Sequence, residues 1–415
     1  MRLIDGSGRA PADHVSILIR NGKIAEIARH NAGAGWPANA RILKLSGKTV
    51  IPGLINGHGH LGLSREDSVS PANYTPENIE AQLAQYERYG ITTMISLGLN
   101  RDLLYRLRAE QEKGNLHGTT ILTAGRGIGV PHGVPAVKVG VDQIYRPATP
   151  EGARRAVQEM AAHSPNLIKI WVDDNLHKLP APNAAVYAAA IDEAHKEHLR
   201  VAAHVYYLTD AKRLLQDGVD ILAHSIRDQE IDTDTLSLLK NKNVYYIPTL
   251  ELEESFFAFA DHPDWMNTTF FQNAVNWRLS KTIDSSGYKK KIKGDPATAI
   301  HRTAFQVALE NLKRVHDAGA PVAFGTDSGA NPFRIQGWAE HRELQLMVQA
   351  GMTPLQAIHS ATAVNAKMLQ LEDKTGTLAA GKQADLIVLN ADPSTDISNT
   401  EKIAMVFHNG IDVKR

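Results

Sequence analysis

Short apolar runs rich in β-branched residues recur along the middle of the chain, and segments with helical periodicity separate most of them. Strands that alternate with helices predict βαβ units and a parallel sheet. Eight such runs are present, which is the number that closes a TIM-like barrel. We therefore predict an α/β protein built on a (β/α)8 barrel, with a doubly wound open sheet as the structural alternative. The predicted strands are Val50–Asn56, Ile91–Leu97, Thr119–Thr123, Leu167–Val172, Arg200–Val205, Asp220–His224, Val244–Thr249 and Val322–Thr326.

The two ends of the chain show a different pattern, in which short strands alternate with turns. VSILIR and KIAEIA flank Asn21-Gly22, a pair that favours a β-hairpin, and ARILKLSG follows them. After about Thr375 the chain continues with GTLAAGKQADLIVLN and IAMVFHNGIDVKR. Because the termini of a domain often lie close together, we expect one composite β-sandwich. The predicted domains are residues 1–48 and 372–415 for the sandwich, and 49–371 for the barrel.

Two connections between the predicted strands are too long to be simple links. The first covers residues 124–150 and contains glycines and prolines without clear periodicity. The second, residues 251–299, holds five of the nine phenylalanines and two tryptophans, and aromatic side chains in such number need burial. We predict that this insert forms a lid with short helices over the barrel mouth. A helical cap that supports the outside of the barrel is the alternative.

The composition limits the classes of partner. Hydrophobic residues make up 43% of the chain and charged residues 22%, with 45 basic and 45 acidic residues, so we expect no nucleic-acid or membrane partner. The N-terminus has no basic-then-apolar leader, which predicts a cytoplasmic protein unless a secretory leader has been removed. The absence of cysteine excludes thiolate ligands and nucleophiles. The 18 histidines are therefore the main source of nitrogen ligands.

Candidate metal ligands occur at the ends of several predicted strands, where parallel barrels carry their reactive groups. His58 and His60 are separated by one glycine, so in an extended chain their imidazoles share a face. Imidazole suits zinc and neighbouring transition metals. The further candidates at strand ends or within strands are Lys169, His204, His224 and Asp327.

Each candidate also has an ordinary structural interpretation. A histidine at the end of a strand is often a hydrogen-bonded packing residue, and Asp327 in GTDSG is compatible with a turn. Lys169 lies in the apolar run LIKIW and must be paired, neutralised or modified there, and a salt bridge to Asp173 or Asp174 is one solution. The conjunction of all six residues favours a metal centre. We assign solvated or packing roles to His195, His198, His301, His316, His359 and His408.

The whole chain resembles the amidohydrolase superfamily, and within it the imidazolonepropionase-like and Xaa-Pro dipeptidase-like branch. The residues that carry the resemblance are PGLINGHGH, Lys169 in LIKIW, His204 in AAHVY, His224 in LAHS, Asp327 in GTDS, AGMTPLQAIHSATAVNAKMLQ and GTLAAGKQADLIVLN. The resemblance implies a metal-dependent hydrolase of amide-like C–N bonds. It also implies a barrel with a composite β-sandwich.

The resemblance further implies a centre with two divalent ions, zinc in the first place and manganese or cobalt as alternatives. His58, His60 and Asp327 would hold one ion, His204 and His224 the other, and an N-carboxylated Lys169 would bridge them. Metal coordination would lower the pKa of a water to about 7, and the resulting hydroxide would attack the carbonyl. Asp327 would take the proton and return it to the leaving amine. An arrangement with one metal ion and an unmodified lysine stays open.

The substrate side of the site is defined less sharply by the sequence. Tyr206 and Arg227 follow two of the histidines, and Arg126 and His132 lie on the loop after the third strand, so these four are the candidate substrate contacts. The aromatic insert favours a small-molecule substrate with an apolar part. Suitable classes are dipeptides with a C-terminal proline or hydrophobic residue, N-acyl amino acids, and aryl ureas or carbamates.

Two other functions are compatible with parts of the pattern. One is hydrolysis of a cyclic amide or imidazolone ring with the same ions. The other is a barrel that has lost catalysis and serves binding or assembly, which predicts gaps in the ligand set. By analogy with related barrels we expect a homo-oligomer.

Overall fold

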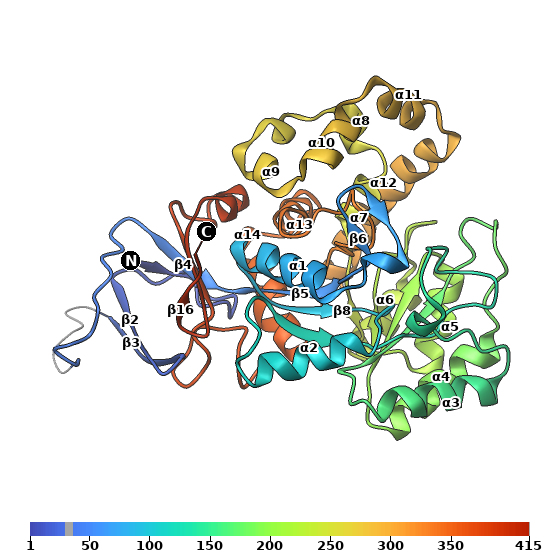
Figure 1. The fold of residues 1–415 in the computed structure, drawn as a ribbon, viewed down its shortest axis with the longest axis horizontal. Coiled ribbons are helices and arrows are strands. Elements are labelled where there is room, and N and C mark those ends of the chain that lie inside the picture. The colour runs from blue at the N-terminus through green and yellow to red at the C-terminus, as the bar shows by residue number, and fades with distance from the viewer. Residues whose placement is uncertain (30–35, 415) are drawn as a thin grey trace.

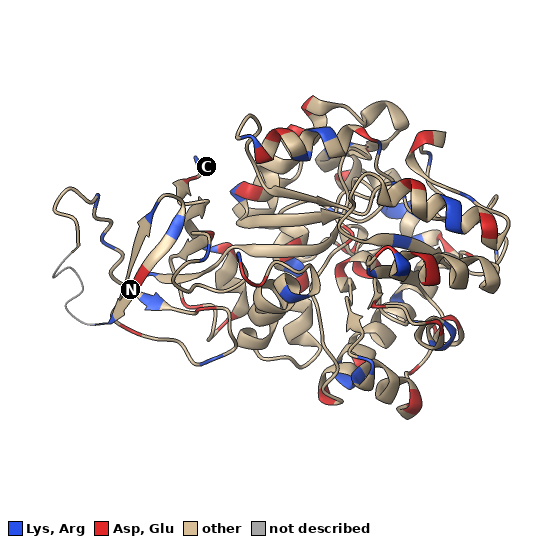
Figure 2. Ribbon diagram, turned by 90° about the horizontal axis from the view of Figure 1, so that it is seen from below, with Lys and Arg blue, Asp and Glu red and all other residues tan. Residues whose placement is uncertain are grey.

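The computed structural model describes residues 1–29 and 36–414 of the 415-residue chain as a mixed α/β protein (Figure 1). Strands from both ends of the chain lie together on one side of the molecule, and parallel strands with flanking helices form its centre. In the parts of the chain that are described, no helix combines the length and apolar character needed to cross a membrane. Basic and acidic residues are interspersed along the ribbon in Figure 2.

The central strands run parallel to one another in two hydrogen-bonded groups. Three strands form a sheet in the order β5-β8-β9, and four form a second sheet in the order β10-β11-β12-β13. The strands are β5 (Leu54–Gly59), β8 (Ile91–Ser96), β9 (Thr120–Thr123), β10 (Ile168–Val172), β11 (Val201–Val205), β12 (Ile221–Leu222) and β13 (Tyr245–Tyr246).

Isolated parallel bridges connect these two groups through segments outside the named strands. The eighth predicted run, Val322–Thr326, is joined to its neighbours in this way on both sides. The connecting bridges are Ile128↔Ile170, Tyr246↔Val322 and Gly59↔Ser328. One cluster of buried side chains takes a member from each of the eight segments, which is typical of the interior of a closed barrel. These members are Ile55, Ile95, Leu122, Leu167, Ala202, Ile221, Tyr245 and Ala323.

Helices follow the parallel strands, and local sequence explains where several of them begin. Thr75, Thr149 and Thr353 each precede a proline, and their hydroxyls accept hydrogen bonds from backbone N–H groups of the first turn. The helices are α1 (Pro76–Arg88), α2 (Leu103–Glu112), α3 (Pro150–Ala161), α4 (Ala184–Lys196), α5 (Leu208–Asp217), α6 (Thr233–Asn241), α12 (Pro296–Asp317), α13 (Trp338–Gln349), α14 (Pro354–His359), η4 (Ser360–Val364) and α15 (Asn365–Met368).

Both ends of the chain contribute to one five-stranded sheet in the order β1-β4-β14-β15-β16. The predicted hairpin at Asn21-Gly22 is present as β2 and β3, and Val15 and Ile24 share an apolar cluster with Val50, Val388 and Phe407 of the sheet. The strands are β1 (Arg2–Leu3), β2 (Val15–Arg20), β3 (Lys23–Arg29), β4 (Thr49–Pro52), β14 (Leu386–Leu389), β15 (Ile403–His408) and β16 (Ile411–Asp412).

Two predicted strands differ from the structure. The segment ARILKLSG is not a strand: Leu45 packs against the apolar cluster of the terminal sheet, but Ile42 is 80% exposed. The predicted strand Val50–Asn56 is two strands, because Gly53 separates β4 of the terminal sheet from β5 of the parallel sheet. The Gly53 N–H donates to the Asp385 carbonyl.

The aromatic insert forms short helices, and most of its aromatic side chains pack against α13. Phe259, Trp265 and Phe271 surround Trp338, with ring centroids 4.6 to 6.2 Å from the Trp338 ring. Figure 1 shows the helices of residues 258–294 above α13 and α12. They are α7 (Leu250–Glu254), α8 (Ala258–Asp261), η3 (Asp264–Asn267), α9 (Thr269–Ala274), α10 (Trp277–Asp284) and α11 (Ser286–Gly294). This packing agrees with the predicted alternative of a cap for most of the insert, whereas α7 borders the candidate site.

Candidate metal centre

His58 and Asp327 are brought together by backbone hydrogen bonds between β5 and the eighth parallel segment. The N–H groups of Thr326 and Asp327 both donate to the His58 carbonyl, at 3.0 and 2.7 Å. As a result, Oδ1 of Asp327 lies 3.0 Å from Nε2 of His58 and 2.9 Å from Nε2 of His60. His58, His60 and Asp327 are all buried, as the prediction of one shared ligand group requires.

His204 and His224 lie beside this group, although β11 and β12 are distant from β5 in the sequence. The His224 ring is 4.6 Å from the His58 ring and 4.3 Å from the His204 ring, measured between centroids. One ligand atom each from His58, His224 and Asp327 falls within 4.8 Å of the other two, a spacing compatible with a single metal ion. These contacts therefore link five of the six predicted ligands.

Lys169, the sixth predicted ligand, projects from β10 and is completely buried. Its Nζ lies 5.4 Å from the centre of the Trp171 ring and has no hydrogen-bond partner among the described residues, which include Asp173 and Asp174, so the alternative of a salt bridge to either aspartate is wrong. Burial lowers the pKa of Lys169 to about 7, although the charge of Asp327 opposes this shift. Burial and the nearby Lys169 also lower the pKa of His58 to about 3.

The residues present fit a bound cation, because several buried nitrogen atoms here form no hydrogen bond within the part of the chain that the structure describes. They are Nδ1 and Nε2 of His58, Nδ1 of His60 and Nζ of Lys169. His58 Nε2 is near Asp327 Oδ1, but the geometry of that contact is not that of a hydrogen bond. Buried polar atoms are normally paired, so this concentration of unpaired donor atoms indicates a site for ions.

Hydrogen bonds on the far sides of His204 and His224 select which ring nitrogen each can offer. Oδ2 of Asp173 lies 2.8 Å from His204 Nε2, and the Thr249 hydroxyl lies 2.8 Å from His224 Nδ1. Nδ1 of His204 and Nε2 of His224 therefore remain available as ligand atoms. Partners of this kind hold metal-binding imidazoles in one orientation.

Asp327 has a second partner that the sequence did not indicate. Oδ2 of Asp327 forms an ion pair with Nη1 of Arg334, which lies seven residues further along the chain. Burial would raise the pKa of Asp327, but the guanidinium of Arg334 and the two neighbouring imidazoles lower it well below its usual range. The carboxylate is therefore ionised and able to bind a cation.

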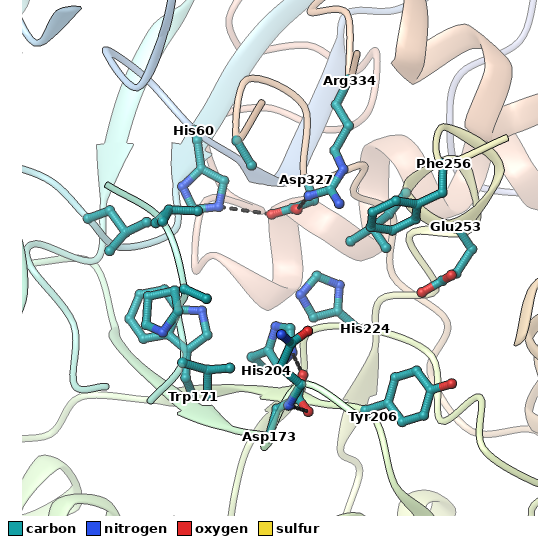
Figure 3. Close-up of a pocket in the computed structure, with 18 of the residues that line it drawn as sticks. His60, Trp171, Asp173, His204, Tyr206, His224, Glu253, Phe256, Asp327 and Arg334 are labelled. Carbon is teal, nitrogen blue, oxygen red and sulfur yellow. Dashed lines mark hydrogen bonds and ion pairs between the residues drawn. The ribbon is translucent and has the colours of Figure 1, made fainter. Parts of the chain in front are cut away.

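A cavity of about 200 Å³ opens onto these residues (Figure 3). Tyr206 and Arg227, two of the four predicted substrate contacts, line this cavity. Arg126 and His132 are not among its lining residues, and Arg126 instead contacts Asp102 and Tyr145. The other lining residues include the apolar Leu99, Val134 and Trp171 and the charged Glu253 and Arg334.

The comparison with protein families agrees with this geometry. The model of the amidohydrolase family matches residues 49–411, which include every predicted ligand. This chain belongs to the amidohydrolase family. Members of the family generally bind divalent metal ions, and the match confirms the resemblance found in the sequence.

Curated relatives of this amidohydrolase have varied names. The ochratoxinase of Aspergillus niger is 28% identical over 274 residues, which cover 62% of this chain and 48% of the relative. The chain thus aligns with about half of that relative's length. An imidazolonepropionase of Geobacillus sp. (strain WCH70) is 24% identical over 418 aligned positions, covering 95% of this chain and 86% of the relative.

Solved structures support the same fold. A Xaa-Pro dipeptidase with bound methionine in its active site superposes with a TM-score of 0.77 at 23% identity, covering 99% of this chain and 97% of the other. The ochratoxinase of Aspergillus niger gives a TM-score of 0.73 at 20% identity, covering 100% of this chain and 95% of the other. The family and these neighbours imply a TIM-barrel fold with an additional domain.

His301 of the amidohydrolase, to which the sequence assigned a solvated or packing role, lines the cavity. It lies on α12, a helix of 22 residues whose first turns reach the cavity. Nδ1 of His301 is 2.8 Å from Oε2 of Glu253, and its ring stacks on Phe256 at 3.7 Å between centroids. A search of strand ends does not find His301, because this residue reaches the cavity from the first turns of a helix.

Glu253 was also missed by sequence reasoning, and it contacts both Arg227 and His301 at the cavity wall. Its Oε1 accepts a hydrogen bond of 2.6 Å from Nε of Arg227, while Oε2 contacts His301. Burial would raise the pKa of Glu253, but Arg227 and His301 lower it. Among the other excluded histidines, His195 pairs with Asp220 and His408 with Glu87, both in structural roles.

Proposed function

We propose that this amidohydrolase is a metal-dependent hydrolase of amide-like C–N bonds. The observation that carries the proposal is the buried group of His58, His60 and Asp327 beside His204 and His224, with unpaired ring nitrogens. The names of its relatives, ochratoxinase and imidazolonepropionase among them, support a hydrolase of this kind. A non-catalytic barrel has no need of such a costly set of unpaired buried groups.

We assign two divalent ions to the centre, with zinc as the first choice and manganese or cobalt as alternatives. His58, His60 and Asp327 would hold one ion, and His204 and His224 the other. When bound, such ions activate water and polarise a carbonyl group. The low pKa of Lys169 supports its reaction with carbon dioxide to a carbamate, which would replace a costly buried cation by an anionic ligand.

The residues of the chain have distinct roles in this proposal. Asp327 accepts the proton of the attacking water and returns it to the departing nitrogen, which is general acid–base catalysis. Its ionised state supports the first of these steps. Tyr206 and Arg227 position the polar part of the substrate. The apolar wall with Leu99, Val134 and Trp171 receives an apolar or aromatic part.

The proposed architecture that holds this site is a closed (β/α)8 barrel over residues 49–371. It is completed by a composite β-sandwich from residues 1–48 and 372–415. The bridges on both sides of residues 322–328 and the interior cluster support closure of the barrel. The apolar contact between the β2–β3 hairpin and the five-stranded sheet supports the sandwich.

A substrate panel tests the proposed function directly. The full chain is supplied with zinc, manganese or cobalt and assayed on dipeptides with C-terminal proline or hydrophobic residues, N-acyl amino acids, a phenylurea, a carbamate and a lactone. We expect metal-dependent turnover of at least one linear amide-like substrate, lost with a chelator and restored by the ion. Absence of turnover of every compound by ion-loaded protein would contradict the hydrolase and favour a binding or assembly role.

A second candidate is hydrolysis of a cyclic amide or imidazolone ring, favoured by the imidazolonepropionase relative that spans 95% of this chain. Adding such a ring to the panel separates the two activities. The number of ions is tested by metal analysis together with the mass of the intact chain. About one ion per active chain, with an unmodified Lys169, would contradict the binuclear centre.

A further inference from the structure

Thr249 occupies the N-cap position of α7 but does not cap this helix. Its backbone is left-handed, with a φ of 46°, whereas an N-cap residue is normally extended. Its hydroxyl lies 2.8 Å from Nδ1 of His224, and in the described structure it accepts no hydrogen bond from the first turn of α7. The N–H groups at the start of α7 therefore need acceptors from another part of the chain.

Glu343 of α13 supplies these acceptors. Its Oε1 accepts a hydrogen bond of 2.9 Å from the Leu250 N–H, and its Oε2 accepts one of 2.7 Å from the Glu251 N–H. Both oxygens act as acceptors at once, which is the arrangement of an ionised carboxylate, because a protonated oxygen also carries a donor. Glu343 is completely buried, so solvent water does not reach this contact.

The surroundings of Glu343 act on its charge in both directions. Burial raises the pKa of Glu343 to about 8, and Glu254 and Glu340 act in the same sense, whereas the two N–H donors oppose the shift. At pH 8.5 most of the carboxyl group is therefore ionised.

Thr249 is held on both sides by backbone hydrogen bonds. On the α7 side, the Leu252 N–H donates to the Thr249 carbonyl at 3.2 Å. On the other side, the Pro248 carbonyl accepts hydrogen bonds from the N–H and the hydroxyl of Ser225, at 3.1 and 2.9 Å. Because Ser225 directly follows His224, a displacement of the first turn of α7 would move the Thr249 hydroxyl relative to the His224 ring.

We propose that Glu343 is a positioning residue of the metal centre, which holds the first turn of α7 so that the Thr249 hydroxyl stays on His224. The carboxylate replaces the cap that Thr249 does not supply, because the threonine hydroxyl serves the imidazole instead. The inference rests on the proposed function, because it takes His224 as a metal ligand.

The test measures the capping contact and ion binding separately, in the full-length chain at pH 8.5. Hydrogen exchange of a peptide covering residues 249–255 reports the first turn of α7, and Zn²⁺ bound per chain is determined at chelator-buffered free concentrations. Glu343→Gln keeps the size of the side chain but replaces one acceptor by an amide donor. We expect at least one amide of the first turn to exchange about tenfold faster. Zn²⁺ should bind about tenfold more weakly.

A double variant tests whether the effect on the ion passes through Thr249. Thr249→Ala removes the hydroxyl from His224 and should weaken Zn²⁺ binding about 10- to 100-fold by itself. In the Thr249→Ala background, Glu343→Gln should still speed the exchange of the first turn but should not weaken Zn²⁺ binding further. A merely structural role of Glu343 would weaken binding equally in both backgrounds.

Glu254→Gln is the matched control on the same helix. Glu254 is also buried, and it pairs with Arg342 of α13 at 2.6 Å instead of holding the first turn of α7. Its replacement should lower the free energy of unfolding and leave Zn²⁺ affinity unchanged. Circular dichroism checks that each variant is folded. If Glu343→Gln does not fold, Glu343→Asp keeps the charge but withdraws it from the two N–H groups, and it should weaken Zn²⁺ binding in the same way.

The outcomes separate this inference from the proposed function. Unchanged Zn²⁺ affinity in the folded Glu343 variant, or an equal loss in Glu254→Gln, would overturn the inference alone. An effect of Glu343→Gln on Zn²⁺ binding that persists with Thr249→Ala would also overturn it. Failure of the unmodified chain to bind Zn²⁺ would overturn both the zinc-dependent function and the inference.

Discussion

Two residues at the metal centre hold backbone conformations that are unfavourable for their side chains. Asp327 has a φ of 60° and Thr249 a φ of 46°, and the left-handed region is a genuine outlier for a β-branched residue. Thr249 directs its hydroxyl at Nδ1 of His224, and Asp327 directs its carboxylate at His58 and His60. Strained backbone conformations of this kind persist at functional sites where contacts with the surrounding structure hold them in place.

Asp327→Asn tests the proton transfer assigned to this carboxylate. An amide keeps the shape of the side chain but cannot accept the proton of the attacking water. We expect kcat to fall by about 100- to 10,000-fold, the range for loss of a general acid–base group. The measurement is kcat on an active substrate, with bound metal determined on the same sample. Unchanged turnover at full metal content would reject the proton-transfer role.

Asp173 lines the cavity and forms a hydrogen bond with His204. Asp173→Asn weakens the acceptor that fixes the ring, so metal affinity or activity should fall about 10- to 100-fold. Asp174→Asn is the matched control, because this neighbour contacts the exposed His177 and Tyr207 instead. Equal losses in the two variants would show that the effect does not pass through His204.

At the scale of secondary structure, the sequence predicted the order of strands and helices well because buried parallel strands produce continuous apolar runs. It did not reveal the change of sheet at Gly53, since β4 and β5 are both entirely buried and give one uninterrupted apolar pattern. Gly53 itself marks this change of sheet in the sequence. A Cβ at this position would lie 2.3 Å from Oγ1 of Thr92, so only glycine permits this close approach.

The aromatic insert divides into two parts with different consequences for mutation. Phe271 is fully buried against Trp338, so Phe271→Ala should lower the free energy of unfolding by about 3–5 kcal/mol without changing KM. Phe256 lines the cavity, so Phe256→Ala should mainly raise KM. Denaturant unfolding and steady-state kinetics of both variants measure these effects. A raised KM for Phe271→Ala would indicate that the whole insert acts as a lid.

At the scale of the whole molecule, the sequence could predict which residues meet at the strand ends, since a parallel sheet fixes where strand ends lie. It could not predict Arg334 or His301 at the site. His301 meets Glu253 across 48 positions of the chain, and only the packing of α12 against α7 brings them together. Arg334 depends on the shape of one loop, which the apolar pattern does not encode.

His408 joins the terminal sheet to the rest of the molecule. It lies on β15, and its ring contacts Glu87 of α1 at 2.7 Å and the Thr120 hydroxyl of β9 at 3.0 Å. Burial would lower the pKa of His408, but the hydrogen bond to Glu87 and the charges of Asp385 and Glu87 raise it above its usual value. The charged imidazole therefore stabilises the attachment of the terminal sheet.

The raised pKa of His408 predicts a defined dependence of stability on pH. A group with a raised pKa in the folded state stabilises fully below its unfolded pKa of about 6.5, and this contribution is lost as pH rises through the folded value. His408→Gln should therefore cost about 1.5–3 kcal/mol at pH 6 and progressively less towards pH 9. Denaturant unfolding across this range measures the difference, and His195→Gln, at a half-exposed pair, should cost under about 1 kcal/mol. A cost of His408→Gln that stays constant or grows with pH would mean that the imidazole is uncharged there, and that packing alone joins β15 to α1.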